Sequence, residues 1–346
     1  MFLGKNVLKV VVLGTGGTIA GESPDPAHDH AYTAAQRPVA ALLQGVALPE
    51  GCEVVTEQVA QLDSKDMDHA TWRQLLARCR HWLSQDVAGI VITHGTDTLE
   101  ETAFFLSQTL ASGKPVVLTC AMRPATSRQA DGPQNLADAL SLVTEPQARG
   151  VMVVCAGEAH SALAVQKVHA SRLNAFASTY NSELRPIATR ENGTWVWAKH
   201  QALGLNALDE AAIEKIAKAC LTQDTWPRVE IVMSHAGATG AVVDALLNSS
   251  DTAPLAGLVV AATGNLTVHA SLQAALDRAR AQGVAVQLAS RCVWGGVVPG
   301  ENSGEAGGAL AVNTRLPDGG QAEAHADAHL SPVKARVALM LQLLAA

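Results

Sequence analysis

Two segments place glycines and hydroxyl groups where apolar strands are expected to end. The first, Thr15 to Gly21, reads TGGTIAG, and the second, Thr93 to Thr98, reads THGTDT. Ligand sites in open α/β sheets lie off the carboxyl ends of the strands. Backbone N–H groups and the positive end of a helix that starts after Asp97 would favour an anion or a developing oxyanion. The spacing therefore points to a site for a small polar ligand.

Each of these residues also has a simpler interpretation. The first segment is compatible with a tight turn, Asp97 with a helix cap, and His94 with a packed histidine rather than a base. Lys167, in an apolar stretch, is compatible with a surface position, although lysine is rarely buried without a partner. A dinucleotide site is not favoured, because the GxGxxG pattern that begins at Gly14 has Ile19 in place of its last glycine.

The elements that must position these residues alternate between strand and helix. Short apolar runs separated by stretches of helical period predict a parallel sheet covered by helices. The expected strands of the first part are Val7 to Leu13, Gly89 to Thr93, Val116 to Thr119 and Val151 to Cys155. Trp72 to Leu83 is expected to be a helix with one buried face. Thr98 and Glu101 predict a capping box for the next helix, and a further helix is expected around Asn135 to Val143.

The predicted fold class is α/β, with a larger N-terminal parallel-sheet domain and a smaller, flavodoxin- or Rossmann-like C-terminal domain. We expect domains at residues 1–197 and 228–346, joined by a linker at 198–227 that carries a helix near Glu210 to Ala219. The expected elements of the second domain are strands Val229 to Met233, Leu258 to Ala262 and Val284 to Leu288, with helices Ala241 to Leu247, His269 to Ala281 and Pro332 to Leu344.

The composition excludes several classes of function. The chain has 346 residues and a net charge of −7, which argues against a nucleic-acid surface. Twelve aromatic residues are too few for a site built on stacked rings. The six cysteines are widely spaced and predict buried small side chains in a reducing compartment, not a metal site. Neither a signal peptide nor a run of about 20 apolar residues is seen, so the expectation is a cytoplasmic protein without membrane contact.

The two threonine-containing segments carry a resemblance to a known family. Thr15 to Gly21 and Gly89 to Leu99 (GIVITHGTDTL) resemble the two signatures of the bacterial L-asparaginase/glutaminase family of threonine amidohydrolases. The similarity continues through Asp63 to Met67, Ala121 to Asn135, Gln166 with Lys167, and Ser331 to Val337. It therefore spans nearly the whole chain, with two long signatures in the expected order.

The resemblance implies catalytic roles for five residues. Thr18 corresponds to the nucleophile and Tyr32 to the tyrosine of a lid, while Thr96, Asp97 and Lys167 correspond to a second catalytic set. A threonine hydroxyl is a weak nucleophile that needs a base or a cation nearby. In this scheme Thr18 attacks the side-chain amide of L-asparagine, ammonia leaves, and water hydrolyses the ester, with Lys167 taking a proton and Asp97 balancing its charge. No metal or organic cofactor is implied.

The resemblance also implies substrate contacts and a homotetramer. Ser64 corresponds to the serine that binds the substrate α-carboxylate, and Ala121 to an alanine whose backbone lines the site. Asn265 and Glu301 are candidates for a contribution from the neighbouring subunit in a tetramer of intimate dimers. Lys65 stands where many members have glutamine. Lysine accepts no hydrogen bond, which gives the hypothesis that this chain prefers asparagine to glutamine.

The sequence is compatible with four functions. The first is hydrolysis of L-asparagine to L-aspartate and ammonia, with minor glutaminase activity. The second is a glutaminase-asparaginase or an amidotransferase subunit for misacylated tRNA, which would require an added domain and a basic face. The third is a non-catalytic amino-acid-binding homologue, which the intact Thr18, Thr96, Asp97 and Lys167 disfavour. The fourth is a nucleotide-dependent dehydrogenase, which lacks its glycine pattern.

Overall fold

The apolar run KVVVL forms the centre of strand β1 (Leu8–Gly16), and its residues Val10 to Leu13 are fully buried. Burial of consecutive residues on both faces is typical of a strand inside a parallel sheet. Strand β2 (Cys52–Leu62) pairs with one edge of β1 and strand β3 (Gly89–Thr93) with the other, both in parallel. These three strands carry the loops that form the candidate site.

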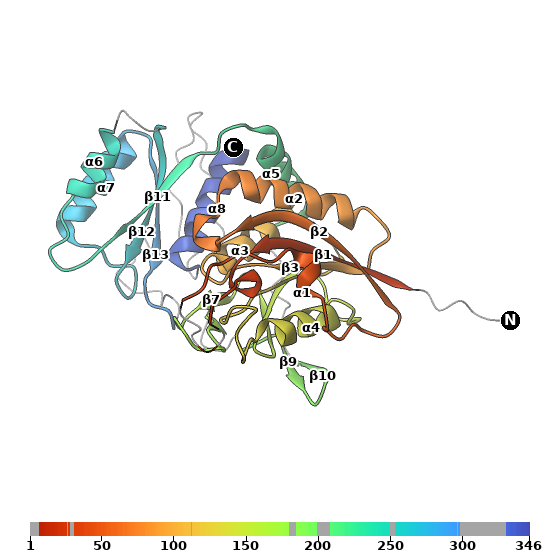
Figure 1. The fold of residues 1–346 in the computed structure, drawn as a ribbon. Helices are drawn as coiled ribbons and strands as arrows, with labels where there is room; N and C mark the ends of the chain where they lie inside the picture. The colour runs from red at the N-terminus through yellow and green to blue at the C-terminus, as the bar shows by residue number, and fades with distance from the viewer. Residues whose placement is uncertain are drawn as a thin grey trace. The chain divides into compact units, whose positions relative to one another are not determined.

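Contacts between residues divide the chain into two compact units. The first comprises Met1–Ser178 and Arg185–Ala217, and the second comprises Thr179–Leu184 and Lys218–Ala346. The computed structural model in Figure 1 describes residues 7–25, 27, 31–111, 113–179, 185–198, 208–249, 253–295, 297 and 330–346. Each unit has its own sheet, so the predicted α/β class with a larger and a smaller domain is confirmed.

The sheet of the first unit has the strand order β10-β9-β6-β5-β4-β3-β1-β2. Its further strands are β4 (Val116–Thr119), β5 (Val151–Cys155), β6 (Glu158–Ser161), β9 (Ala188–Glu191) and β10 (Thr194–Trp197). The strands β1 to β5 pair in parallel, which confirms the predicted parallel sheet, whereas β6, β9 and β10 each pair antiparallel with their neighbours in the strand order. The sheet is mixed because the two-residue turn at Ala156 and Gly157 joins β5 to β6, and a connection this short can only reverse the chain.

Helices cover both faces of this sheet (Figure 1). Helix α1 (Val39–Leu42) and helix α4 (Gly132–Leu142) share one buried apolar cluster with β1, and its members include Val39, Leu136, Val10 and Val12. Helix α2 (His69–Leu83) and helix α3 (Leu99–Thr109) pack against each other, with the rings of Trp72 and Phe105 stacked at 4.9 Å. The helix predicted from Trp72 to Leu83 is therefore confirmed and begins three residues earlier.

The predicted capping box at the start of α3 is wrong. Thr98 occupies the N-cap position, but its side chain makes no capping hydrogen bond. Its hydroxyl donates instead to the carbonyl of Ser64, at 2.7 Å. The polar group that the local sequence assigns to a helix end is thus used to join two loops.

The second unit is a three-layer arrangement around a parallel sheet. Strands β11 (Arg228–Met233), β12 (Leu255–Ala262) and β13 (Ala285–Ser290) have the order β11-β12-β13. Helices α6 (Ala241–Leu247) and α7 (Ala270–Ala281) share an apolar cluster with the sheet, and helix α8 (Pro332–Ala345) contacts all three strands. Helix α5 (Glu210–Thr222) lies within the stretch predicted as a linker with a helix.

Membrane-spanning helices, metal ligands and cysteines were each the subject of a prediction. In the part of the chain that the structure describes, no helix is long and apolar enough to cross a membrane. The described residues also contain no group of three or more His, Cys, Asp or Glu side chains arranged to hold a metal ion. The cysteines form no disulfides, and four are buried. Cys52, at the start of β2, is only partly buried and Cys292, in a surface loop after β13, is exposed, so the expectation of six buried cysteines is wrong for these two.

Candidate active site

The candidate site lies where the strand order of the first sheet reverses. From β1 the chain continues to β2 on one side and then crosses to β3 on the other. Such a switch point leaves a crevice at the carboxyl ends of the two central strands. Thr18 follows β1 directly, in the short 3-10 helix η1 (Thr18–Ala20), and Thr96 follows β3. Thr15 joins the two strands by donating to the carbonyl of Thr93, at 2.9 Å.

Two glycines allow the loops after β1 and β3 to touch through their backbones. Gly17 has a φ of 79°, and a Cβ on it would overlap the main chain of Gly95. A Cβ on Gly95 would overlap the side chain of Ser64. Because only glycine permits this approach, the residues that follow the two glycines, Thr18 and Thr96, are carried to the same end of the sheet.

The Thr18 side chain is buried and hydrogen-bonded to Tyr32. The distance between the Thr18 Oγ1 and the Tyr32 Oη is 2.8 Å, and either oxygen can be the donor. Tyr32 is 37% exposed, and its ring lies over Gly21, where a Cβ would come within 2.9 Å of it. The structure therefore brings together the two residues that the sequence assigns to nucleophile and lid.

A second set of side chains surrounds the ammonium group of Lys167. This residue ends strand β7 (Val165–Lys167), which pairs with β8 (Phe176–Ser178) in a small separate sheet. The Lys167 Nζ donates to the Thr96 Oγ1 at 2.8 Å and to the Asp97 Oδ1 at 2.6 Å. Lys167 is mostly buried, whereas the Asp97 side chain is half-exposed. Lys167, Thr96 and Asp97 thus form one hydrogen-bonded group, with its carboxylate facing solvent.

Ser64 connects the loop after β2 to this group. It begins the short helix η2 (Ser64–Asp66) and is fully buried. Its Oγ accepts a hydrogen bond from the backbone N–H of Asp97 at 3.1 Å. Together with the Thr98 hydroxyl on the Ser64 carbonyl, this bond fixes the loop that bears Thr96 and Asp97.

Lys65 does not join the group around Lys167. Its ammonium is exposed and pairs with Asp66 at 2.8 Å and with Asp63 at 3.1 Å. These hydrogen bonds, first with Asp66 and then with Asp63, raise the pKa of Lys65. The role of Lys65 in substrate binding stays a prediction, and its position beside two acids gives it a local partner instead.

The remaining predicted contacts fall in different parts of the chain. Ala121 is buried just after β4, and Gly132 at the start of α4 packs close to both Ala121 and Ile19. Asn265 lies in an exposed turn after β12, in the second unit. Glu301 lies outside the described residues. The contribution of Asn265 and Glu301 to a neighbouring site, and the homotetramer itself, stay predictions.

His94 proves to be a packed histidine, the simpler of its two interpretations. It is fully buried, and its Nδ1 lies 2.7 Å from the carbonyl of Gly95, so Nδ1 carries the hydrogen. The Nε2 has no hydrogen-bond partner among the described residues. Burial lowers the pKa of His94 to about 4, against a smaller opposing effect of the Gly95 hydrogen bond. The neutral His94 imidazole therefore holds the Gly95 carbonyl in place through this hydrogen bond.

Two further residues have hydrogen bonds that the sequence did not single out individually. Asp131 and Asn135 lie at the start of α4 and bind the backbone that leaves β4. Both belong to the segment from Ala121 to Asn135 that resembles the family. The signal that could have found them is their spacing of four residues, which places two polar side chains on one helix face.

The contact of Gly95 predicts a selective loss of stability on substitution. In Gly95→Ala the methyl group must displace the Ser64 side chain, so we expect the free energy of unfolding to fall by about 1–3 kcal/mol. Gly113→Ala is the control, because nothing lies within 4 Å of its added methyl group; its change should stay within about 0.5 kcal/mol. Urea denaturation measures both, and equal midpoints would contradict the close packing.

The pKa of His94 predicts a pH dependence of stability. Below a pH of about 6.5 the unfolded chain protonates this imidazole, whereas the folded chain resists protonation down to about pH 4. The free energy of unfolding should therefore fall as the pH falls through this window, by about 3 kcal/mol from this group. In His94→Gln this component should disappear, while His81→Gln, at an exposed position, should retain it. Urea denaturation at pH 7 and pH 4.5 measures the difference, and an unchanged slope in His94→Gln would refute it.

Sequence and structure comparisons agree with this geometry. The family model "Asparaginase, N-terminal" matches residues 9–202, and "Glutaminase/Asparaginase C-terminal domain" matches residues 228–345. The chain is 32% identical to L-asparaginase 2 of Bacillus subtilis over 347 aligned residues, covering 98% of this chain and 83% of the relative. It is 33% identical to the glutaminase-asparaginase of Pseudomonas fluorescens, covering 96% of this chain and 86% of the relative.

A solved structure extends the similarity to the fold. The crystal structure of a probable cytoplasmic L-asparaginase from Campylobacter jejuni has a TM-score of 0.80 and 31% identity, with coverage of 97% of this chain and 95% of that one. The family models together cover both sheets and every loop of the candidate site in the first unit. The chain therefore belongs to the asparaginase/glutaminase family of enzymes.

Proposed function

We propose that this protein is an L-asparaginase, which hydrolyses L-asparagine to L-aspartate and ammonia through an ester on Thr18. The observation that carries the proposal is the group formed by Lys167, Thr96 and Asp97 beside a second buried threonine hydroxyl. The similarity to proteins named L-asparaginase 2 and glutaminase-asparaginase supports the substrate class. The scarcity of aromatic residues fits a small zwitterion held by hydroxyls, a carboxylate and backbone groups.

The first half of the reaction is assigned to Thr18. Its Oγ1 attacks the side-chain amide carbon, the C–N bond breaks, and the proton of the hydroxyl passes to the departing ammonia. The hydrogen bond with Tyr32 supports this role, because it restricts the Thr18 rotamer and gives the hydroxyl proton a first acceptor. Backbone N–H groups near Thr96 would stabilise the oxyanion, an effect of about 10²–10³ in rate for each donor.

The second half is assigned to the Lys167 group. A water molecule attacks the ester carbonyl, its proton passes through the Thr96 Oγ1 to Lys167, and the Thr18 oxygen leaves with the return of a proton. Asp97 stabilises the ammonium that this transfer produces. The hydrogen bonds of the Lys167 Nζ to both the Thr96 Oγ1 and the Asp97 Oδ1 support this path.

Ser64 and Asp97 are assigned to the two charged ends of the amino acid. The Ser64 oxygen already accepts from the Asp97 N–H, which leaves its hydroxyl hydrogen to donate to the α-carboxylate. The Asp97 carboxylate is half-exposed and can accept from the substrate ammonium. Binding of both ends beside Thr18 would orient the amide for attack.

Removal of the nucleophile or of a proton-transfer group is expected to abolish turnover. Thr18→Ala, Thr96→Val and Lys167→Met should each lower kcat on L-asparagine by at least about 10²-fold, because each removes the nucleophile or a proton-transfer group. Lys114→Met is the matched control, since that ammonium binds the carbonyls of Leu83 and Gln85 away from the site. Release of ammonia measures kcat, and wild-type kcat in Lys167→Met would show that the proton-transfer assignment is wrong.

The choice between the two amides is a separate prediction. We expect kcat/KM to be at least about tenfold higher for L-asparagine than for L-glutamine, because one extra methylene shifts the amide away from Thr18. Lys65→Gln tests the hypothesis that Lys65 sets this preference. A lower ratio in the variant would support it, whereas an unchanged ratio would agree with the ion pairs to Asp63 and Asp66. Equal kcat/KM values in the wild type would contradict the preference for asparagine.

A further inference from the structure

The amide of Asn135 links the ends of two neighbouring strands. Asn135 is buried in the first turn of α4, and its Nδ2 donates to the carbonyl of Cys120, directly after β4, at 2.9 Å. Its Oδ1 accepts from the N–H of Ala156, directly after β5, at 3.0 Å. Ala156 has a φ of 52°, which is unfavourable for a residue with a side chain, so this bond also supports a tight turn.

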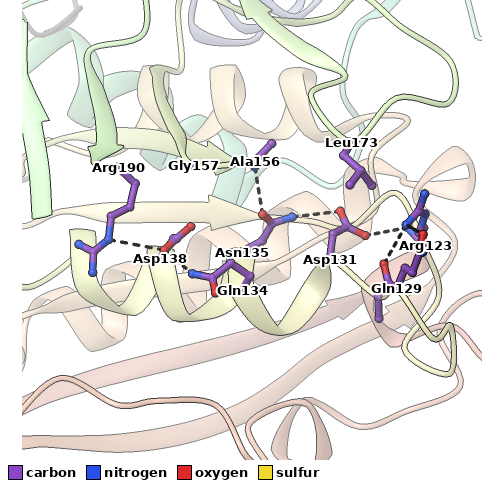
Figure 2. A pocket seen from close by; sticks show the side chains of 11 residues that line it. Arg123, Gln129, Asp131, Gln134, Asn135, Asp138, Ala156, Gly157, Leu173 and Arg190 are labelled. Atoms are coloured by element: carbon purple, nitrogen blue, oxygen red, sulfur yellow. Dashed lines mark hydrogen bonds and ion pairs between the residues drawn. The ribbon is translucent and has the colours of Figure 1, made fainter. Parts of the chain in front are cut away.

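Asp131 holds the next part of the same loop. Its two carboxylate oxygens accept from the N–H groups of Met122 and Arg123, each at 2.9 Å. The Asn135 Nδ2 also donates to Asp131, at 3.2 Å, which orients the carboxylate. Figure 2 shows the two side chains directed at each other, with Asn135 reaching Ala156 on its other side.

These contacts fix both peptide groups that flank Ala121. The carbonyl of the first peptide, from Cys120, is bound by Asn135, and the N–H of the second, from Met122, is bound by Asp131. In a trans peptide the C=O and N–H point in opposite directions. The N–H and C=O of Ala121 itself are therefore turned away from Asn135 and Asp131, and within the described part of the chain neither has a hydrogen-bond partner.

Ala121 is a close neighbour of the loop that bears Thr18. Gly132 packs between Ile19, the neighbour of Thr18, and Ala121, at 2.9 Å and 3.5 Å from the position of its missing Cβ. The pKa of the Cys120 thiol is raised chiefly by its hydrogen bond to Cys155 and by burial, and the charge of Lys167 acts on it in the opposite direction. Ala121 thus lies beside the Thr18 loop, and its neighbour Cys120 is close enough to Lys167 to be affected by its charge.

We infer that Asn135 and Asp131 are positioning residues that aim the backbone N–H and C=O of Ala121 into the active site. They touch no reacting atom and act through the peptide groups on either side of Ala121. The inference rests on the proposed function for the identity of the substrate, and on the hydrogen bonds above for the geometry. A displacement of such a backbone group by about 1 Å can cost about 10² in rate.

A cavity beside α4 makes the substitution of Asn135 informative. The cavity has a volume of about 550 Å³. Its lining includes Asn135, Gln134, Asp131, Asp138 and Arg190 (Figure 2). A shorter side chain at position 135 therefore leaves space that is continuous with this cavity and that water can fill. Gln134 provides the matched control, because it lies on the same helix and its amide donates only to Asp138, at 2.9 Å.

The first experiment compares Asn135→Ala with Gln134→Ala. We expect kcat/KM for L-asparagine to fall by about 10–100-fold in Asn135→Ala and to stay within about twofold in Gln134→Ala. Both are measured well below their melting temperatures, so a loss of stability alone does not lower the rate. Wild-type kcat/KM in Asn135→Ala, while the wild-type enzyme hydrolyses asparagine, would overturn the inference and leave the proposed function intact.

The second experiment uses Asn135→Asp and a pH profile. An ionised carboxylate at position 135 would repel Asp131 and the Cys120 carbonyl, whereas a protonated one can donate to that carbonyl as the amide does. The ratio of its kcat to that of the wild type should therefore rise as the pH falls, while the ratio for Asn135→Ala stays level. A level ratio for Asn135→Asp would overturn the inference, because a purely structural role changes the melting temperature without this rescue.

A third measurement does not depend on activity. Crystal structures of the wild type and of Asn135→Ala are expected to differ in the orientation of the peptides on either side of Ala121. Unchanged peptides would overturn the inference. If the wild type released no ammonia from asparagine, the proposed function would fail, and this structural comparison would still decide the role of Asn135.

Discussion

The backbone contact between Gly17 and Gly95 is the constraint on which the site depends. The first glycine follows β1 directly and the second lies two residues after β3, at the point where the strand order reverses. No side chain fits between them, so the two loops meet at van der Waals distance. Thr18 and Thr96 are each one residue further along these loops, and the bond from Thr15 to Thr93 joins the same two strands across 78 residues of sequence. The relative position of the two threonine-bearing loops thus depends on the absence of a side chain at Gly17 and Gly95.

Hydrogen bonds between loops and within the connection from β4 to α4 hold the rest of the site. Ser64 accepts from Asp97 and binds Thr98, while Asn135 and Asp131 bind the backbone around Ala121. The bond from Asn135 to Cys120 is buried and the others are partly buried, so an unpaired polar group at these positions would be costly. Backbone hydrogen bonds from Gly17 to Leu62 and from Ala125 to Gly21 join the loop after β1 to the end of β2 and to the loop after β4, so the four loops form one connected set.

Much of the scaffold was predictable because local patterns determine it. The buried face of α2, with Trp72, Leu75, Leu76 and Cys79, follows from helical spacing, and β1 and β3 follow from runs of apolar residues. Strand β2 was not predicted, since its sequence CEVVTEQVAQL mixes charged and apolar residues as an edge strand does. The antiparallel strands β6, β9 and β10 were missed because each has only four residues, and so short a strand carries little periodic signal.

The sequence by itself determined the residue types of the site, its place at the ends of strands, and the family. Motif letters such as THGTDT state which groups are present, but a side chain's partner is chosen by segments far away in the chain. Only the tertiary structure decided that Thr98 binds Ser64 instead of capping its helix, that Lys65 pairs with Asp63 and Asp66, and that Asn135 joins β4 to β5. The physical reason is that hydrogen-bond and ion-pair energies act over a few ångströms, and chain folding alone sets which groups come that close.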